Sequence, residues 1–170
     1  MEKTEQKLVA VSADLISRAQ TMQIAVDTAR KLGERFYTMK PFYLGLLNRA
    51  NRGEYLGEFE LEFASITQDF NVMYGILARE TGRLGHTDMP FSMKFGNIRC
   101  WLQNASDFIS APAPSEHREF KKWVTKAIDE MELLDQDLRS FTSVWQVELN
   151  NLRNVTADIY DWRLENTFNR

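Results

Sequence analysis

The last 56 residues of the chain, from Ser115 to Arg170, contain neither glycine nor proline. Apolar residues recur through this stretch at steps of three and four, which places them on one stripe of an α-helix. The stripe consists of Phe120, Val124, Ala127, Met131, Leu134, Leu138, Phe141, Trp145, Leu149, Leu152, Val155, Ile159 and Trp162. Because the pattern lacks the alternation of a half-buried strand, it predicts a long amphipathic helix over 115–170 and an all-α fold.

The length of this helix constrains the rest of the fold. At about 1.5 Å per residue an unbroken helix would extend roughly 80 Å, whereas a compact domain of this size measures on the order of 32 Å. The helix is therefore expected either to fold back as a helical hairpin or to project from the rest of the chain. The two steps of four at Phe141, Trp145 and Leu149 predict a kink or turn between Ser140 and Asn154, a region rich in weak helix formers.

The amino-terminal part of the chain has the same helical periodicity. Apolar residues at heptad spacing predict a first helix from Thr4 to about Met39. Pro41 is expected to end it, since a proline disfavours the helical conformation of the residue before it. A short separate helix is then predicted from Phe42 to Asn51.

Two further helices are predicted in the middle of the chain. The first covers Glu54 to about Leu84, where apolar residues alternate strictly by three and four, and Gly82 and Gly85 are expected to end it. The second covers Pro90 to Ser110, with Asp88 as its N-cap.

The connections between these helices are short. The only low-complexity linker, residues 111–114, is too short to separate domains, and Ser115 is expected to cap the last helix. The sequence thus predicts a single domain over 1–170, a four-helix-type bundle of long amphipathic helices with an extended C-terminal helix. A separate helix after Pro41 and a break in the last helix would raise the count to five or six.

Composition sets limits on location and partners. The content of 44% hydrophobic and 26% charged residues is ordinary for a globular protein, and the net charge of −3 neither indicates nor excludes a polyanionic partner. The polar start and the lack of any apolar run of about 18 residues predict no signal peptide and no membrane span, so a cytoplasmic protein is expected. The single cysteine, Cys100, agrees with a reducing compartment, and its place beside Trp101 on an apolar stripe predicts a small buried side chain.

Residues that carry chemistry are few. His86 and His117 are the only histidines, and neither forms the Glu-x-x-His pair of di-iron bundles. A lone cysteine excludes a Cys-rich zinc site, and no glycine-rich phosphate-binding loop is present. We therefore expect no metal, no cofactor and no catalytic site, with His117 exposed in the first turn of the last helix.

One segment resembles an enzyme motif. Arg79 is followed by His86 with six residues between them, which is similar to the RxxxxxxH pattern of HEPN ribonucleases, themselves helical bundles. The resemblance implies phosphate stabilisation by Arg79 and acid–base chemistry by His86. Two glycines and Glu80 depart from that pattern. The alternative is a helix C-terminus whose cations complement the helix dipole.

A basic segment offers another alternative function. Between residues 30 and 52 the cations greatly outnumber the single acid and are interleaved with aromatic residues, an arrangement that can bind phosphates and stack bases. The candidate nucleic-acid-binding residues are Lys31, Arg35, Lys40, Arg49 and Arg52. The other interpretation is that the aromatic residues pack inward while the cations lie in solvent.

The apolar stripe of the last helix leads to the main hypothesis. It is longer than a compact monomer can cover, so we expect a non-enzymatic interaction protein that associates with a second copy as a homodimer or with another protein as a hetero-complex. The predicted interface consists of Leu138, Phe141, Trp145, Leu149, Leu152, Ile159 and Trp162. Truncation after about Leu138 is expected to abolish association and leave the amino-terminal bundle folded. The alternative remains a nucleic-acid-binding or HEPN-like RNA-cleaving bundle.

Overall fold

The computed structural model describes residues 2–85, 89, 91–112 and 114–168. Within them it contains the helices α1 (Glu2–Asn51), α2 (Glu60–Arg83), α3 (Ser92–Ser106) and α4 (Pro114–Phe168), and a short 3₁₀ helix, η1 (Gly57–Phe59). None of the described residues lies in a strand. The predicted all-α class is confirmed.

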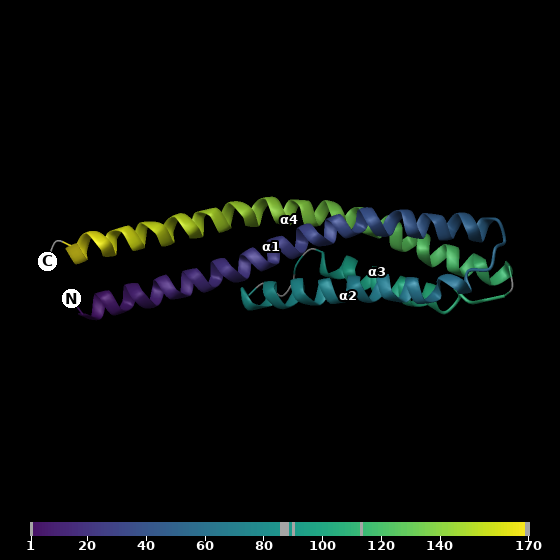
Figure 1. The fold of residues 1–170 in the computed structure, drawn as a ribbon, viewed down its shortest axis with the longest axis horizontal. Coiled ribbons are helices and arrows are strands. Elements are labelled where there is room, and N and C mark those ends of the chain that lie inside the picture. The colour runs from purple at the N-terminus through teal and green to yellow at the C-terminus, as the bar shows by residue number, and fades with distance from the viewer. Residues whose placement is uncertain (1, 86–88, 90, 113, 169–170) are drawn as a thin grey trace.

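The molecule has a thick half and a thin half. Helices α1 and α4 lie side by side and antiparallel along its whole length, whereas α2 and α3 accompany them along one half only (Figure 1). Buried hydrophobic residues begin at Met22 on α1 and end at Leu149 on α4. We call residues 22–149 the head and the remaining two-helix part, residues 2–21 and 150–168, the stalk. The first turn of α1 and the last turn of α4 lie at the tip of the stalk.

Aromatic side chains from all four helices form the core of the head. The ring of Phe70 on α2 lies 5.9 Å from that of Phe36 on α1 and 5.3 Å from that of Phe95 on α3. Phe91, which caps α3, contacts Phe141 of α4 edge to face at 5.4 Å. All five rings are buried. Such pairs add to the free energy of apolar burial and join the helices into one core.

Helix α1 does not end before Pro41, and the two predicted helices are one. Met39 and Tyr43, on either side of the proline, are fully buried, whereas Pro41 itself faces solvent. A proline inside a helix removes one backbone hydrogen bond and costs about 3 kcal/mol. Packing of the helix on both sides of the proline outweighs that cost, which a local rule cannot take into account.

The turn predicted as one alternative between Ser140 and Asn154 is absent, because α4 is continuous. The hydroxyl of Thr142 donates to the carbonyl of Leu138 at 2.7 Å, so this weak helix former hydrogen-bonds within the helix. Leu149 is fully buried, and the helix projects beyond the head instead of folding back.

The other helix ends differ by a few residues from the prediction. Gly53 has a φ of 73° in the turn after α1, and α2 begins at Glu60 rather than at Glu54. Gly85, with a φ of 84°, follows the end of α2 as predicted, whereas Gly82 lies inside the helix. Helix α3 spans Ser92–Ser106 rather than 90–110, and α4 already includes Pro114, so Ser115 is not its cap. The predicted cap Asp88 lies outside the described residues.

Tyr43 carries a buried polar group in the core and leads to a first prediction. Its hydroxyl forms no well-aligned hydrogen bond, and the nearby Thr67 hydroxyl donates to the Phe63 carbonyl at 2.8 Å. Burial raises the pKa of Tyr43, with a smaller opposing effect from Thr67. The neutral phenol therefore contributes stability that is fully present below the unfolded-state pKa near 10 and is lost as the pH rises toward the folded-state pKa.

We expect Tyr43→Phe to raise the free energy of unfolding at pH 7 by about 1 kcal/mol, because it removes an unsatisfied buried hydroxyl. We also expect it to reduce the loss of stability between pH 9 and 11. Urea unfolding of the original chain and of Tyr43→Phe across this pH range tests the prediction. The other tyrosines are present in both proteins, so any difference in the alkaline loss of stability comes from Tyr43. Equal alkaline losses would show that Tyr43 ionises as easily in the folded chain as in the unfolded one.

Candidate interaction surface

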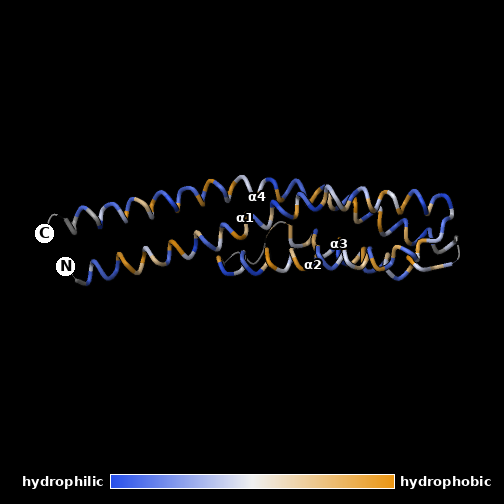
Figure 2. Tube along the Cα trace, viewed as in Figure 1, coloured by the Kyte–Doolittle hydropathy of each residue, from blue (hydrophilic) through white to orange (hydrophobic). Residues whose placement is uncertain are grey.

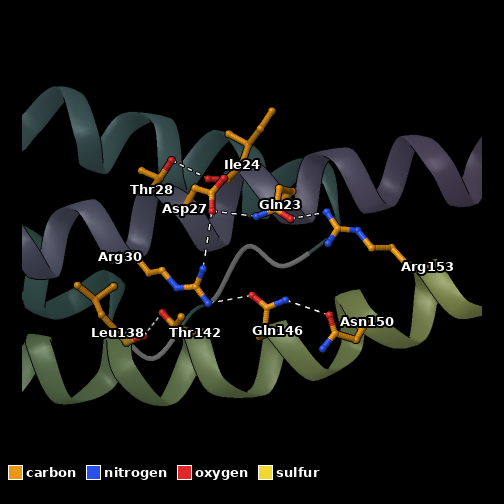
Figure 3. A network of polar contacts seen from close by, with 10 residues as sticks. All are labelled: Gln23, Ile24, Asp27, Thr28, Arg30, Leu138, Thr142, Gln146, Asn150 and Arg153. Atoms are coloured by element: carbon orange, nitrogen blue, oxygen red, sulfur yellow. Dashed lines mark hydrogen bonds and ion pairs between the residues drawn. The ribbon is translucent and has the colours of Figure 1, made fainter.

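Polar side chains fix the register of α1 against α4 where the stalk leaves the head (Figure 3). Arg30 of α1 donates to Gln146 of α4 at 2.9 Å, and Arg153 of α4 donates to Gln23 of α1. The two bonds are seven residues apart on both helices. Gln23 also donates to Asp27 at 2.8 Å. Because a shift of either helix by one turn would break both cross-helix bonds, they specify one antiparallel pairing.

A third cross-helix pair extends the same register into the head. Lys40 of α1 forms an ion pair with Glu132 of α4. Nearby, Arg139 of α4 donates to the hydroxyl of Tyr37 on α1 at 3.3 Å. The α1–α4 pair is therefore aligned by contacts within the head as well as at the junction with the stalk.

The stalk exposes apolar side chains that its two helices cannot cover. Hydrophobic positions recur along both helices toward the chain ends (Figure 2). The exposed large ones in the stalk are Val9, Val11, Ile16, Val155, Tyr160 and Trp162. Two helices shield only the seam between them, so residues beside the seam stay accessible. One surface depression gathers such residues from both helices and is lined by Leu8, Val155, Asp158, Ile159 and Trp162.

The structure divides the predicted interface residues into two groups. Those of the head, Leu138, Phe141, Trp145 and Leu149, are buried within this chain. Those of the stalk are accessible: Leu152 and Ile159 are half-buried and Trp162 is 43% exposed. Truncation after Leu138 would remove three core residues, so we now expect it to unfold the head. Only the stalk part of the stripe has surface to offer a partner.

The stalk also has an α1 side that was not among the predicted interface residues. Leu8 lines one depression with Val155 and Trp162 of α4, and Val11, which is exposed, follows Leu8 by three residues on the same side of α1. Their heptad spacing is visible in the sequence. Their pairing with α4 depends on the antiparallel register and could not be inferred from spacing alone.

The predicted nucleic-acid-binding residues are mostly paired with carboxylates. The pairs are Arg35 with Asp69 at 3.3 Å, Lys40 with Glu132, Arg49 with Glu54 at 3.3 Å and Arg52 with Glu54 at 3.9 Å. Lys31 is exposed on α1. Phe36 and Tyr43 of the same segment pack inward. Little unneutralised positive charge remains on this surface, so it offers weak support for phosphate binding.

Of the HEPN-like pair only Arg79 lies in the described part of the chain, so its pairing with His86 stays a prediction. Arg79 is exposed and its Nε lies 3.3 Å from Oε1 of Glu80. The Glu80 carboxylate is buried and also contacts Arg83 at 3.4 Å. His86 lies outside the described residues. Arg79 therefore has a carboxylate beside it, as the sequence indicated, and this negative charge opposes the binding of a phosphate.

Two predictions about single residues were wrong. His117 is 4% exposed rather than solvent-facing, and neither ring nitrogen has a hydrogen-bond partner. It precedes Phe120 by three residues and therefore shares the apolar stripe. Cys100 is exposed rather than buried. Cys100 lies two residues from Ile98 and two residues from Leu102, and both of these are buried. Side chains two residues apart in an α-helix point to nearly opposite sides, so Cys100 faces solvent.

A cluster of tryptophan and lysine residues covers the contact between α3 and α4. The Nζ atom of Lys126 lies 5.8 Å from the ring of Trp101 and 5.2 Å from that of Trp123. Lys122 lies 4.7 Å from the Trp123 ring. Both indoles are half-buried. Their exposed faces are thus already occupied by the chain's own cations.

Two further kinds of site are absent from the described residues. They contain no group of three histidine, cysteine or acidic side chains that could hold a metal ion. None of their helices has a stretch that is both long and apolar enough to cross a bilayer.

Compared with models of known protein families, with curated proteins and with solved structures, the chain gives no match.

Proposed function

We propose that this protein is a non-enzymatic interaction protein that uses its two-helix stalk to associate with a protein partner. The observation that carries the proposal is the change in cross-section along the molecule. In the head, α2 and α3 cover the α1–α4 pair, whereas in the stalk exposed valine and tyrosine side chains continue with no helix over them. Exposed apolar side chains that gather from two helices, as Leu8, Val155 and Trp162 do in one depression, are typical of protein–protein contacts.

The stalk is suited to a partner made of helices. Two surface depressions join α1 and α4 here. One is lined by Leu8, Val155 and Ile159, and the other includes Ile16, Arg153 and Thr156. A groove between two helices accepts the apolar stripe of another helix, as in helix-in-groove recognition. We place this role in the cytoplasm, since a lone and exposed cysteine is compatible with a reducing compartment.

Amine cross-linking in the native host can test whether the stalk is the part that contacts a partner. Lys3 and Lys7 are the only lysines of the stalk, and all six others belong to the head. We expect intermolecular cross-links from Lys3 and Lys7, identified by mass spectrometry. A Lys3→Arg, Lys7→Arg variant should keep the association and lose these cross-links. Intermolecular cross-links confined to head lysines would overturn the proposal.

A further inference from the structure

The face of α4 that contacts α3 in the head continues into the stalk. Phe141 and Asp137 mark this face, since Phe141 packs on Phe91 at 5.4 Å and Asp137 pairs with a lysine of α3. An α-helix returns to the same direction after 18 residues, or five turns. The positions equivalent to Asp137 and Phe141 are therefore Val155 and Ile159. Both keep the direction of the head contact. Ile159 also keeps the apolar character of Phe141, whereas Val155 is apolar where Asp137 forms an ion pair.

Helix α1 supplies the other half of this face. Leu8 lines the same depression as Val155 and Ile159, and Val11 follows Leu8 by three residues on the same side of the helix. Val11 is 50% exposed and Val155 is 46% exposed. Val9, in contrast, lies one heptad before Ile16, which borders a separate depression with Arg153 and Thr156 on the other side of the seam.

We infer that the stalk of a second copy of this chain covers this face, so that two stalks form an antiparallel four-helix bundle. The inference rests on the proposed function and names its partner. The uncovered face is two helices wide, and a single peptide helix would leave half of it in water. The chain's own stalk is a two-helix layer of the same length with the same apolar face.

The available area is sufficient for a specific dimer. The stalk helices contain about 20 residues each, which gives a length of about 30 Å, and two helices side by side are about 20 Å wide. Each copy thus offers about 600 Å², or about 1,200 Å² in total. This reaches the lower end of the range for standard specific interfaces and exceeds the minimum of about 1,000 Å².

The position of the heads fixes the orientation. Helices α2 and α3 lie over the same face of the α1–α4 pair that the second stalk would cover. Two copies pointing the same way would bring these layers into collision. The heads must therefore lie at opposite ends, with the stalks overlapping in the middle and the same patch used by both copies around a two-fold axis.

Light scattering and sedimentation equilibrium of the full chain over a range of concentrations test the association. We expect a dimer. The Val11→Asp, Val155→Asp double variant should weaken it at least about 100-fold, because each copy would bury two unpaired carboxylates. The matched control is Val9→Asp, Val147→Asp, which changes valines that are 45% and 59% exposed. Val147 lies in the head beside Arg30 and Gln146, so the control should dimerise within about threefold of the original chain.

Energy transfer between labels on the natural Cys100 tests the orientation. This cysteine is exposed and is the only one in the chain. Cys100 adjoins Trp101, whose ring contacts Lys126 of α4. Along α4, Lys126 is about 33 residues from Ile159, which lies at the middle of the stalk. The two labels of a tail-to-tail dimer would therefore be about 100 Å apart at about 1.5 Å per residue. We expect no transfer within the dimer, and efficient transfer would overturn the inferred arrangement.

The failures of the two proposals can be told apart. A chain that stays monomeric at every concentration overturns the inference of a second copy. The proposed function survives that result if Lys3 and Lys7 cross-link to another protein. A dimer that persists in the Val11→Asp, Val155→Asp variant also overturns the inference. If circular dichroism shows that the aspartates unfold the stalk, the Val11→Ser, Val155→Ser variant provides the same comparison.

Discussion

Replacing Phe95 with alanine is expected to lower the free energy of unfolding by about 3–5 kcal/mol, the usual cost of removing a buried aromatic ring. Phe95 has no exposed surface and lies at the centre of the aromatic core. Its ring stacks on Tyr74 at 4.1 Å and also contacts Phe70 at 5.3 Å and Phe91 at 5.8 Å. The substitution leaves a cavity between α2 and α3 that the surrounding helices can fill only in part.

Urea unfolding monitored by circular dichroism measures this effect. The matched control is Met93→Ala in the same helix, because Met93 is 77% exposed and its loss should change stability by no more than about 0.5 kcal/mol. If Phe95→Ala cost less than about 1 kcal/mol, the aromatic cluster would not be the core that holds α2 and α3 on the α1–α4 pair.

Replacing Pro41 with alanine is expected to have a large effect of the opposite sign, a gain of about 2 kcal/mol. Pro41 is exposed in the interior of α1, where it leaves a carbonyl one turn earlier without its backbone donor. Alanine restores that hydrogen bond. It also makes the unfolded chain more flexible, which lowers the free energy of unfolding by about 0.4–1 kcal/mol. No packing is lost, because the proline ring lies on the surface.

The control for this prediction is Pro112→Ala. Pro112 is exposed in the connection between α3 and α4, where proline restricts the unfolded chain without interrupting a helix. Its replacement should lower stability by less than about 1 kcal/mol. Thermal and urea unfolding of both variants give the comparison. A loss of stability in Pro41→Ala would mean that the head requires the backbone geometry that proline imposes on α1.

Much of the helical content could be predicted because helical periodicity is a local property. The steps of three and four along residues 120–162 predict α4, and the same pattern predicts α2 with its buried Phe63, Phe70 and Leu77. The glycine after α2 could be placed as well, since few other residues tolerate the positive φ of Gly85. These features depend only on which residues are neighbours in the chain.

The candidate surface was predictable only in part. The sequence places Trp145 and Trp162 on one stripe, yet Trp145 is buried in the head and Trp162 is accessible in the stalk. Nothing in their spacing distinguishes them, because the difference arises from what packs against α4. The Trp145 ring contacts Phe141, which packs on Phe91 at the start of α3, whereas Trp162 lies in the stalk beyond this contact. The basic segment shows the same limit, since its acidic partners come from other helices.

The amino-acid order by itself thus determined that this chain is helical and which side of each helix is apolar. In an α-helix the number of residues between two side chains fixes whether they point to the same side. The tertiary structure alone decided that α1 runs through Pro41, that α4 continues past Asn154 and that the two are aligned by Arg30 and Arg153. It also decided which apolar residues are covered. Burial depends on what packs against a face, and that is set by segments more than a hundred residues away in the chain.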